Sequence, residues 1–308
     1  MNLIPLRSLF LVVSLGLSQI TLAQADRTIA ERPLPDVPTL MHEVEQHQRA
    51  SERVQKDYLY HEIVSLQDNG KKTETREYDV FWLNGVEVHK LIRKDGRDLT
   101  EDETNKESER IDKEVAKAKE RKSKADSKGQ ETDSHGHEEI TVSRFLSLGS
   151  FTNPRHVQID GRDTIAIDYT GDPKAKTHNR GEDVVRNLAG TIWVDEEDRS
   201  ISRLEGHFIN NFKIGAGLLI NIKKDTSFLF QQKKINGEVW LPSHAEGQGA
   251  ARVMLFVNFN GSARFTYSDY RKFKATSTIL PGVATVSDPS APDGTSSQTE
   301  GTPSPNPQ

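Results

Sequence analysis

The chain has 308 residues, with 41 Lys and Arg against 46 Asp and Glu, a formal net charge of -5 and no Cys. These figures exclude a disulfide scaffold, a thiolate metal site and a cysteine nucleophile, and a hydrophobic content of 34% excludes a polytopic membrane protein. The slightly acidic balance, without a dense basic stripe, argues against a nucleic-acid-binding protein.

The first 25 residues have the three-part order of a secretory signal peptide. A short positive region ends at Arg7, an apolar run at residues 9–17 is too short to span a bilayer, and Ala23-Gln24-Ala25 fits the A-x-A cleavage pattern. We expect export with cleavage near Ala25, no transmembrane span in the mature chain and, without a Cys at the cleavage point, no lipoprotein anchor. The periplasm is the expected location, with secretion as the alternative.

Composition divides the rest of the chain. Residues 26–38 hold three prolines, which predicts an extended lead-in. Residues 101–139 carry dense charge of both signs and few large apolar side chains, which predicts a solvated helix over 101–124 and disorder over 125–137. Residues 277–308 are rich in Ser, Thr, Pro and Gly, which predicts a disordered tail. A single domain, residues 39–276, contains the charged insertion and one core.

The domain is predicted to open with one helix and then to be mostly strand. Residues 40–56 carry a thin apolar stripe, and Thr39 is the expected N-cap. Three strands at 58–66, 74–83 and 86–93 follow, joined by turns at Asn69-Gly70 and Asn84-Gly85, which makes a meander.

Beyond the insertion, a short helix over 140–148 is expected, and then further strands. These strands are predicted at residues 157–159, 163–169, 190–195, 201–208, 218–222 running on toward 234, 238–241, 252–259 and 263–270. The last two flank Asn260-Gly261, a strong hairpin signal. An antiparallel sheet of this size must curl, so the predicted fold class is α+β: an incomplete β-barrel with an N-terminal helix and few further helices.

The order of these elements resembles the LolA-like superfamily of periplasmic proteins. The resemblance covers roughly residues 40–273 and is carried by patterns of strand and turn: Tyr58-Leu59-Tyr60 entering a strand, Gly161-Arg162-Asp163, the segment 190–205 and Trp240-Leu241-Pro242. It implies an apolar cavity for acyl chains, as in outer-membrane lipoprotein carriers, glycolipid-binding lipoproteins and envelope-stress sensors. The chain departs from the short carriers in its charged insertion, its length and its tail, so no ligand-gating residue is carried over.

An incompletely closed sheet with few helices to fill it leaves an apolar hollow, where apolar ligands bind. The candidates to face such a ligand are aromatic residues of the central strands, each of which ordinary core packing would also explain: Trp193, Phe208, Phe228, Phe230, Phe256 and Phe265.

No catalytic constellation or cofactor motif is found, and no metal site is expected. The segment from His135 to Glu139 has two imidazoles and two carboxylates, but in a stretch that predicts disorder. The acidic run from Asp195 to Asp198 has no EF-hand spacing, so a solvated turn is the expected reading.

Two functions from different classes remain open. The first is a non-enzymatic periplasmic binding or carrier protein, whose partner is a lipid or the acyl chains of a lipoprotein held in the half-barrel cavity. The second is an envelope sensor or interaction scaffold with a packed sheet, which contacts a protein partner through the charged insertion.

Overall fold

A computed structural model describes residues 32–130, 132–214, 220–253 and 257–272. The signal peptide and tail, which were predicted from residues 1–25 and 277–308, lie outside the described residues, as does Phe256.

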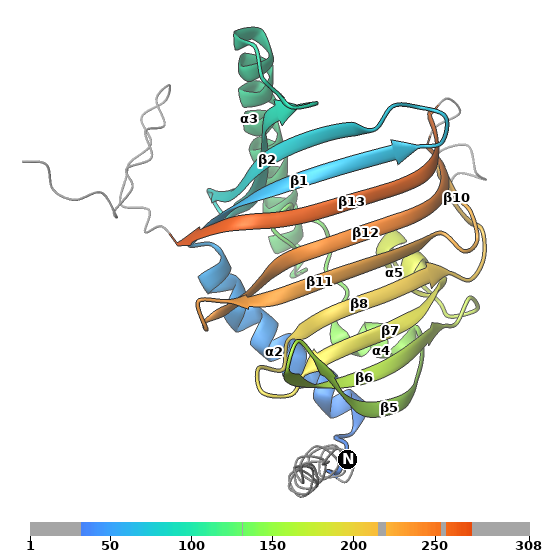
Figure 1. Cartoon of the computed structure of the whole chain (residues 1–308). Helices are drawn as coiled ribbons and strands as arrows, with labels where there is room; N and C mark the ends of the chain where they lie inside the picture. The colour runs from blue at the N-terminus through green and yellow to red at the C-terminus, as the bar shows by residue number, and fades with distance from the viewer. Residues whose placement is uncertain (1–31, 131, 215–219, 254–256, 273–308) are drawn as a thin grey trace, which may run out of the picture. The chain divides into compact units, whose positions relative to one another are not determined.

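The described strands form one 13-stranded antiparallel sheet that is not closed into a barrel (Figure 1). The order is β4-β3-β2-β1-β13-β12-β11-β8-β7-β6-β5, with β10 paired to β12 and β9 paired to β10. The strands are β1 (Tyr58–Asp68), β2 (Glu74–Leu83), β3 (Val86–Lys94), β4 (Arg97–Asp98), β5 (Gly149–Ile159), β6 (Arg162–Gly171), β7 (Leu188–Asp195), β8 (Ile201–Phe208), β9 (Phe212–Ile214), β10 (Ile220–Ile222), β11 (Ser227–Ile235), β12 (Val239–Val253) and β13 (Val257–Lys272). The α+β class and the open, antiparallel character of the sheet are therefore confirmed.

Four helices are present among the described residues: α2 (Val37–Gln55), α3 (Glu101–Asp126), α4 (Val142–Ser147) and α5 (Arg180–Val185). Helix α2 crosses behind the sheet in Figure 1, and α4 and α5 lie behind the same face. The predicted N-cap of α2 was wrong by three residues. Asp36 caps the helix by accepting a hydrogen bond from the Thr39 backbone N–H, because Pro38 fits the first turn and lets the helix begin earlier.

Two apolar clusters hold the helices behind the sheet. In the first, Leu40 and Val44 of α2 pack on Ile165 and Ile167 of β6 and on Ile192 of β7. In the second, Val54 near the end of α2 packs on a group from β1, β2, β11 and β12: Tyr58, Tyr60, Val80, Ile235, Val239 and Leu241. Burying these side chains is the main source of stability for a chain without disulfides.

Helix α3 packs along the edge of the sheet instead of standing free in solvent. A third cluster joins Ile111 and Val115 of α3 to Val86 and Val88 of β3. Polar groups of α3 also bind the backbone of β3: Glu107 accepts from the Leu91 N–H at 2.8 Å, and Arg110 donates to the His89 carbonyl at 2.6 Å. The helix therefore covers backbone groups that an edge strand would otherwise leave open to pairing.

Residues 132–138, at the end of the charged insertion, form local backbone contacts. A β-bridge joins Thr132 to Glu138, and the Asp133 carboxylate accepts from the backbone N–H groups of His135 and His137 at 2.9 and 2.8 Å.

The predicted hairpin turn at Asn260-Gly261 was wrong. Both residues lie inside β13, where Asn260 pairs with Ala250 and Gly261 pairs with Gly249 and with Asp68 of β1. The ladder between β12 and β13 runs on to the pair Val253 and Val257, so the two strands connect between these residues, about five positions earlier in the chain than predicted. Among the described residues, no helix is long and apolar enough to cross a membrane.

Candidate functional site

The register of the central strands aligns apolar residues in two neighbouring rows on one face of the sheet. One row runs from β8 to β1 through Leu204, Phe230, Ala245, Phe265 and Val64. The next row runs through Gly206, Phe228, Gly247, Ala263 and Leu66. Leu204 packs against the cluster that contains α2, so this face is the one that the helices cover. We call the two rows the apolar strip.

The helices leave part of the apolar strip open. Phe228 is 36% exposed, and Phe230 and Phe265 are half-buried. The Phe228 ring lies over Gly206, where an added Cβ would come within 2.6 Å of it. An incompletely covered row of aromatic rings on an otherwise packed face is the kind of surface that contacts an apolar ligand.

The structure brings three of the six sequence-predicted ligand residues together in the strip: Phe228, Phe230 and Phe265. Phe208 lies on the same face, two residues beyond Gly206, and is 7% exposed with its ring 5.8 Å from that of Phe212. Trp193 points to the opposite face, because it alternates with the buried Ile192 and Val194, and the Arg203 guanidinium covers its ring at 5.2 Å.

A polar trough of about 720 Å³ lies along the same strands, and its lining also includes Gly206, Phe228, Gly247 and Ala263 of the apolar strip. Most of its lining side chains stand at positions that alternate with the apolar strip, on β8, β11, β12 and β13: Glu205, His207, Ser227, Glu246, Gln248 and Arg264. The central sheet thus has one polar and one apolar face, as strand alternation requires.

The charges of the trough neutralise one another. Glu205 pairs with Arg203, and Glu246 accepts from His244 at 2.9 Å and from Arg264 at 3.1 Å. The hydrogen bond from His244, followed by that from Arg264, lowers the pKa of Glu246. The trough therefore has no unpaired carboxylate at these two positions to act as a general base.

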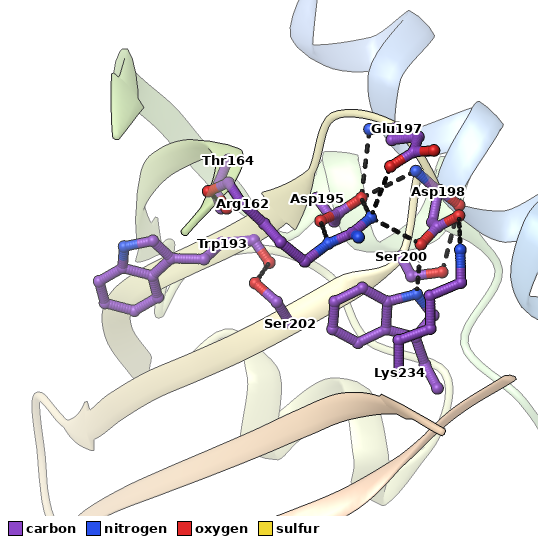
Figure 2. A network of polar contacts seen from close by, with 10 residues as sticks. Arg162, Thr164, Trp193, Asp195, Glu197, Asp198, Ser200, Ser202 and Lys234 are labelled. Atoms are coloured by element: carbon purple, nitrogen blue, oxygen red, sulfur yellow. Dashed lines mark hydrogen bonds and ion pairs between the residues drawn. The ribbon is translucent and has the colours of Figure 1, made fainter. Parts of the chain in front are cut away.

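The acidic turn after β7 is solvated only at Glu197, whose side chain is 77% exposed, while Asp195 and Asp198 are bound within the fold, as Figure 2 shows. Arg162 donates to Asp195 at 2.5 Å and to Asp198 at 2.9 Å, and Asp195 is 1% exposed. Asp198 also accepts from Lys234 Nζ at 2.8 Å and from Trp240 Nε1 at 3.0 Å. The turn is thereby tied to β6, β11 and β12.

Protein cations therefore occupy the carboxylates of this turn. Burial on its own would raise the pKa of Asp198, but the hydrogen bonds from Lys234 and Trp240 outweigh it and the pKa is lowered. Within the described ranges, no group of three or more His, Asp and Glu side chains is arranged to hold a metal ion. His135 and His137 each face a separate carboxylate, those of Glu114 and Asp133.

The comparisons with known proteins find similar folds but no sequence relatives. No family model matches the chain, and no curated protein matches it. A solved domain of an outer-membrane lipoprotein-sorting protein from Vibrio parahaemolyticus has a TM-score of 0.38 at 11% identity, over 76% of this chain and 93% of that one.

Two further solved structures are similar. A DUF1329 family protein from Desulfovibrio piger has a TM-score of 0.37 at 11% identity, over 79% of this chain and 96% of that one. A LolA superfamily protein from Nitrosomonas europaea has a TM-score of 0.29 at 11% identity, over 77% of this chain and 94% of that one. At 11% identity the likeness concerns the fold alone. One of these three neighbours bears the name of the superfamily that the order of elements in the sequence resembles, and another is a lipoprotein-sorting domain.

Proposed function

We propose that the protein is a non-enzymatic, periplasmic binding or carrier protein for the acyl chains of a lipid or lipoprotein. The observation that carries the proposal is the apolar strip, in which Phe228, Phe230 and Phe265 remain partly exposed on the helix-covered face. An acyl chain laid along the strip would remove this surface from water, at about 0.8 kcal/mol for each buried CH₂. Export through the signal peptide would place the protein in the periplasm, where acylated molecules pass between the membranes.

The test is native mass spectrometry of the protein after export and gentle purification from the periplasm, followed by lipid extraction. We expect one acyl lipid or acylated peptide for each chain. The variant Phe228→Ser should lose most of this ligand, because Phe228 is an exposed member of the strip. Leu229→Ser is the matched control, since Leu229 is the next residue on the same strand and its side chain points to the other face of the sheet.

Two results would contradict the proposal. One is a wild-type protein that carries no lipid and takes none up from mixed phospholipids. The other is equal loss of ligand in the Phe228→Ser and Leu229→Ser variants at unchanged circular dichroism.

A second candidate function is supported by α3. The helix has a full capping box at Thr100 and Glu103, packs on β3 along one side, and exposes alternating charges on the other, among them Lys106, Glu109 and Lys113. A rigid charged face of this kind suits a sensor or scaffold that binds an envelope protein. Charge reversal at Lys106 and Lys113 should then abolish a specific cross-link to that partner while the lipid content stays the same.

A further inference from the structure

A second cleft, of about 410 Å³, opens where α5 meets β9. Its lining includes three cations, Arg180, Arg186 and Lys213, but a single carboxylate, that of Asp183. Asp183 is already engaged, by Arg186 at 2.8 Å and by the Thr177 hydroxyl at 2.7 Å. The cleft therefore has a surplus of positive charge.

Arg180 and Lys213 carry that surplus. Both are exposed, and neither forms an ion pair within the described ranges of the chain. One polar atom of the lining, Arg186 Nε, is also buried without a hydrogen-bond partner. Asn221 Oδ1 is buried without one as well; Asn221 is outside the lining but pairs with Lys213 in the β9–β10 ladder. Buried polar groups in native structures ordinarily have a hydrogen-bond partner, so the cleft has a donor that a bound ligand could satisfy.

Two buried aromatic rings, those of Phe212 and Phe208, stand between the cleft and the apolar strip. Phe212 lines the cleft, and its ring lies 5.8 Å from that of Phe208. Phe208 stands two residues beyond Gly206 on β8, and the Phe228 ring covers Gly206. The cleft and the strip therefore lie on either side of this packed aromatic pair.

We propose that this cleft binds the phosphate group of an anionic lipid whose acyl chain lies along the apolar strip. The inference rests on the proposed function and adds the class of headgroup. Arginine presents a planar fork of donors that matches phosphate oxygens, and a lysine ammonium adds a point charge, so Arg180 and Lys213 supply the recognition. The surplus charge disfavours a headgroup that carries no negative charge.

The test compares three probes on the full exported protein by native mass spectrometry and calorimetry: phosphatidylglycerol, diacylglycerol with the same chains, and inorganic phosphate. The double variant R180Q/K213Q should weaken phosphatidylglycerol binding by at least about tenfold and leave diacylglycerol binding unchanged. K174Q/K176Q is the control, because it removes the same charge from exposed lysines outside the cleft. Added salt should weaken the binding of phosphatidylglycerol more than that of diacylglycerol.

The outcomes separate the two proposals. Equal binding of both lipids, unaffected by R180Q/K213Q, overturns the headgroup site and leaves the acyl-binding function standing. Inorganic phosphate that binds as tightly as phosphatidylglycerol overturns the lipid assignment, since the acyl chain would then add nothing. Failure of every lipid to bind the wild type overturns the proposed function itself.

Discussion

Position 261 has no room for a side chain. A Cβ at Gly261 would lie 1.8 Å from the Gln67 carbonyl oxygen of β1, because β13 runs very close to β1 at this point. At Gly247, on the neighbouring strand β12, the nearest atom to an added Cβ would be the Ser227 carbonyl oxygen at 3.8 Å, an ordinary contact. The two glycines therefore differ in what they tolerate although both lie within strands.

We expect Gly261→Ala to destabilise the protein by about 2 kcal/mol, because the backbones of β1 and β13 must move apart. Gly247→Ala should change the free energy of unfolding by less than about 0.5 kcal/mol. Urea unfolding followed by circular dichroism measures both values. Equal stability of the two variants would show that β13 shifts away from β1 without cost.

This contact also explains why the sequence pointed to a turn. Asn260-Gly261 has the composition of a hairpin, but its polar groups bind the end of β1: the Asn260 carbonyl accepts from the Asn69 N–H at 2.8 Å, and the Asp68 carboxylate accepts from the Asn260 N–H at 3.1 Å. A tight turn and a close approach of two strands select the same residue, glycine. Local sequence does not separate them, since the difference depends on a strand almost 200 residues away.

The candidate site could likewise be predicted only in part from the sequence. Alternation within β11 gives Phe228 and Phe230 the same face, and this much can be read from the sequence. Grouping them with Phe265 instead of Trp193 needs the register across β8, β12 and β13, which depends on the bulges between Trp193 and Val194 and between Gln231 and Gln232. A bulge changes the face of every residue that follows, and no local pattern marked either one.

At the scale of elements, one ion pair joins the two short helices α4 and α5. Arg144 donates to both carboxylate oxygens of Glu182, at 3.0 and 2.7 Å, and Glu182 is 2% exposed. The hydrogen bond from Arg144, against the opposing effect of burial, lowers the pKa of Glu182 from 4.5 to about 2. A six-residue helix has little stability of its own, so both helices depend on this contact and on packing.

Because the pKa of Glu182 is lower in the folded state, the pair stabilises the protein fully above about pH 4.5 and loses its effect as the pH falls toward about 2. We expect this loss to be about 2 kcal/mol. The Glu182→Gln variant should lack that part of the decline in unfolding free energy between pH 5 and pH 2.5. Parallel pH curves for wild type and variant would show that Glu182 titrates alike in both states.

Helix α3 depends on few apolar contacts for its position. Composition predicted a helix in this segment, and the structure has one, but the density of charge around Ile111, Val115 and Ala118 did not indicate that these side chains are buried. These residues stand four and three positions apart, so they share one side of the helix, and that narrow stripe is enough to pack on Val86 and Val88. The apolar stripe is not evident from composition, because the rest of the helix consists mostly of exposed charged residues.

We expect Ile111→Ala to detach α3 at a cost of about 2 kcal/mol, since it removes a buried side chain from the smallest cluster. Hydrogen exchange should then become fast in residues 101–126 and at the edge of β3, and stay slow in β6. Lys113→Ala is the control, because the Lys113 side chain is 71% exposed. Uniform loss of protection across the sheet would contradict a local role for Ile111.

At the scale of the whole molecule, the chain moves from one edge of the sheet to the other within a single connection. Strand β4 lies at one end of the sheet order and β5, the next strand in sequence, lies at the other. Ten strand spacings separate them, roughly 48 Å along the sheet. Helix α3 and the segment that follows it connect these two edges, so the charged insertion must be long enough to reach from β4 to β5.

Replacing residues 101–139 by a direct junction should therefore prevent the fold from forming. The residues left between β4 and β5 would be 99–100 and 140–148, which with α4 intact reach only about 26 Å. We expect loss of the near-ultraviolet circular dichroism signal and of soluble yield. A flexible Gly/Ser linker of the original length is the control, and it should restore the sheet while leaving the edge of β3 uncovered.

The pairing of β1 with β13 divides the molecule into two parts. Strands β1 to β4 form one part, a sequential meander, and strands β5 to β13 form the other. Among the described residues, the single ladder between the two parts runs from Tyr58 with Lys272 to Asp68 with Gly261. Shortening the connection between the two parts would strain them, but cutting it would not. Two separate polypeptides, divided near residue 131, should therefore associate in solution and re-form the sheet through the β1–β13 ladder. The protein would then be suited to fragment complementation, in which association of the two fragments restores the fold.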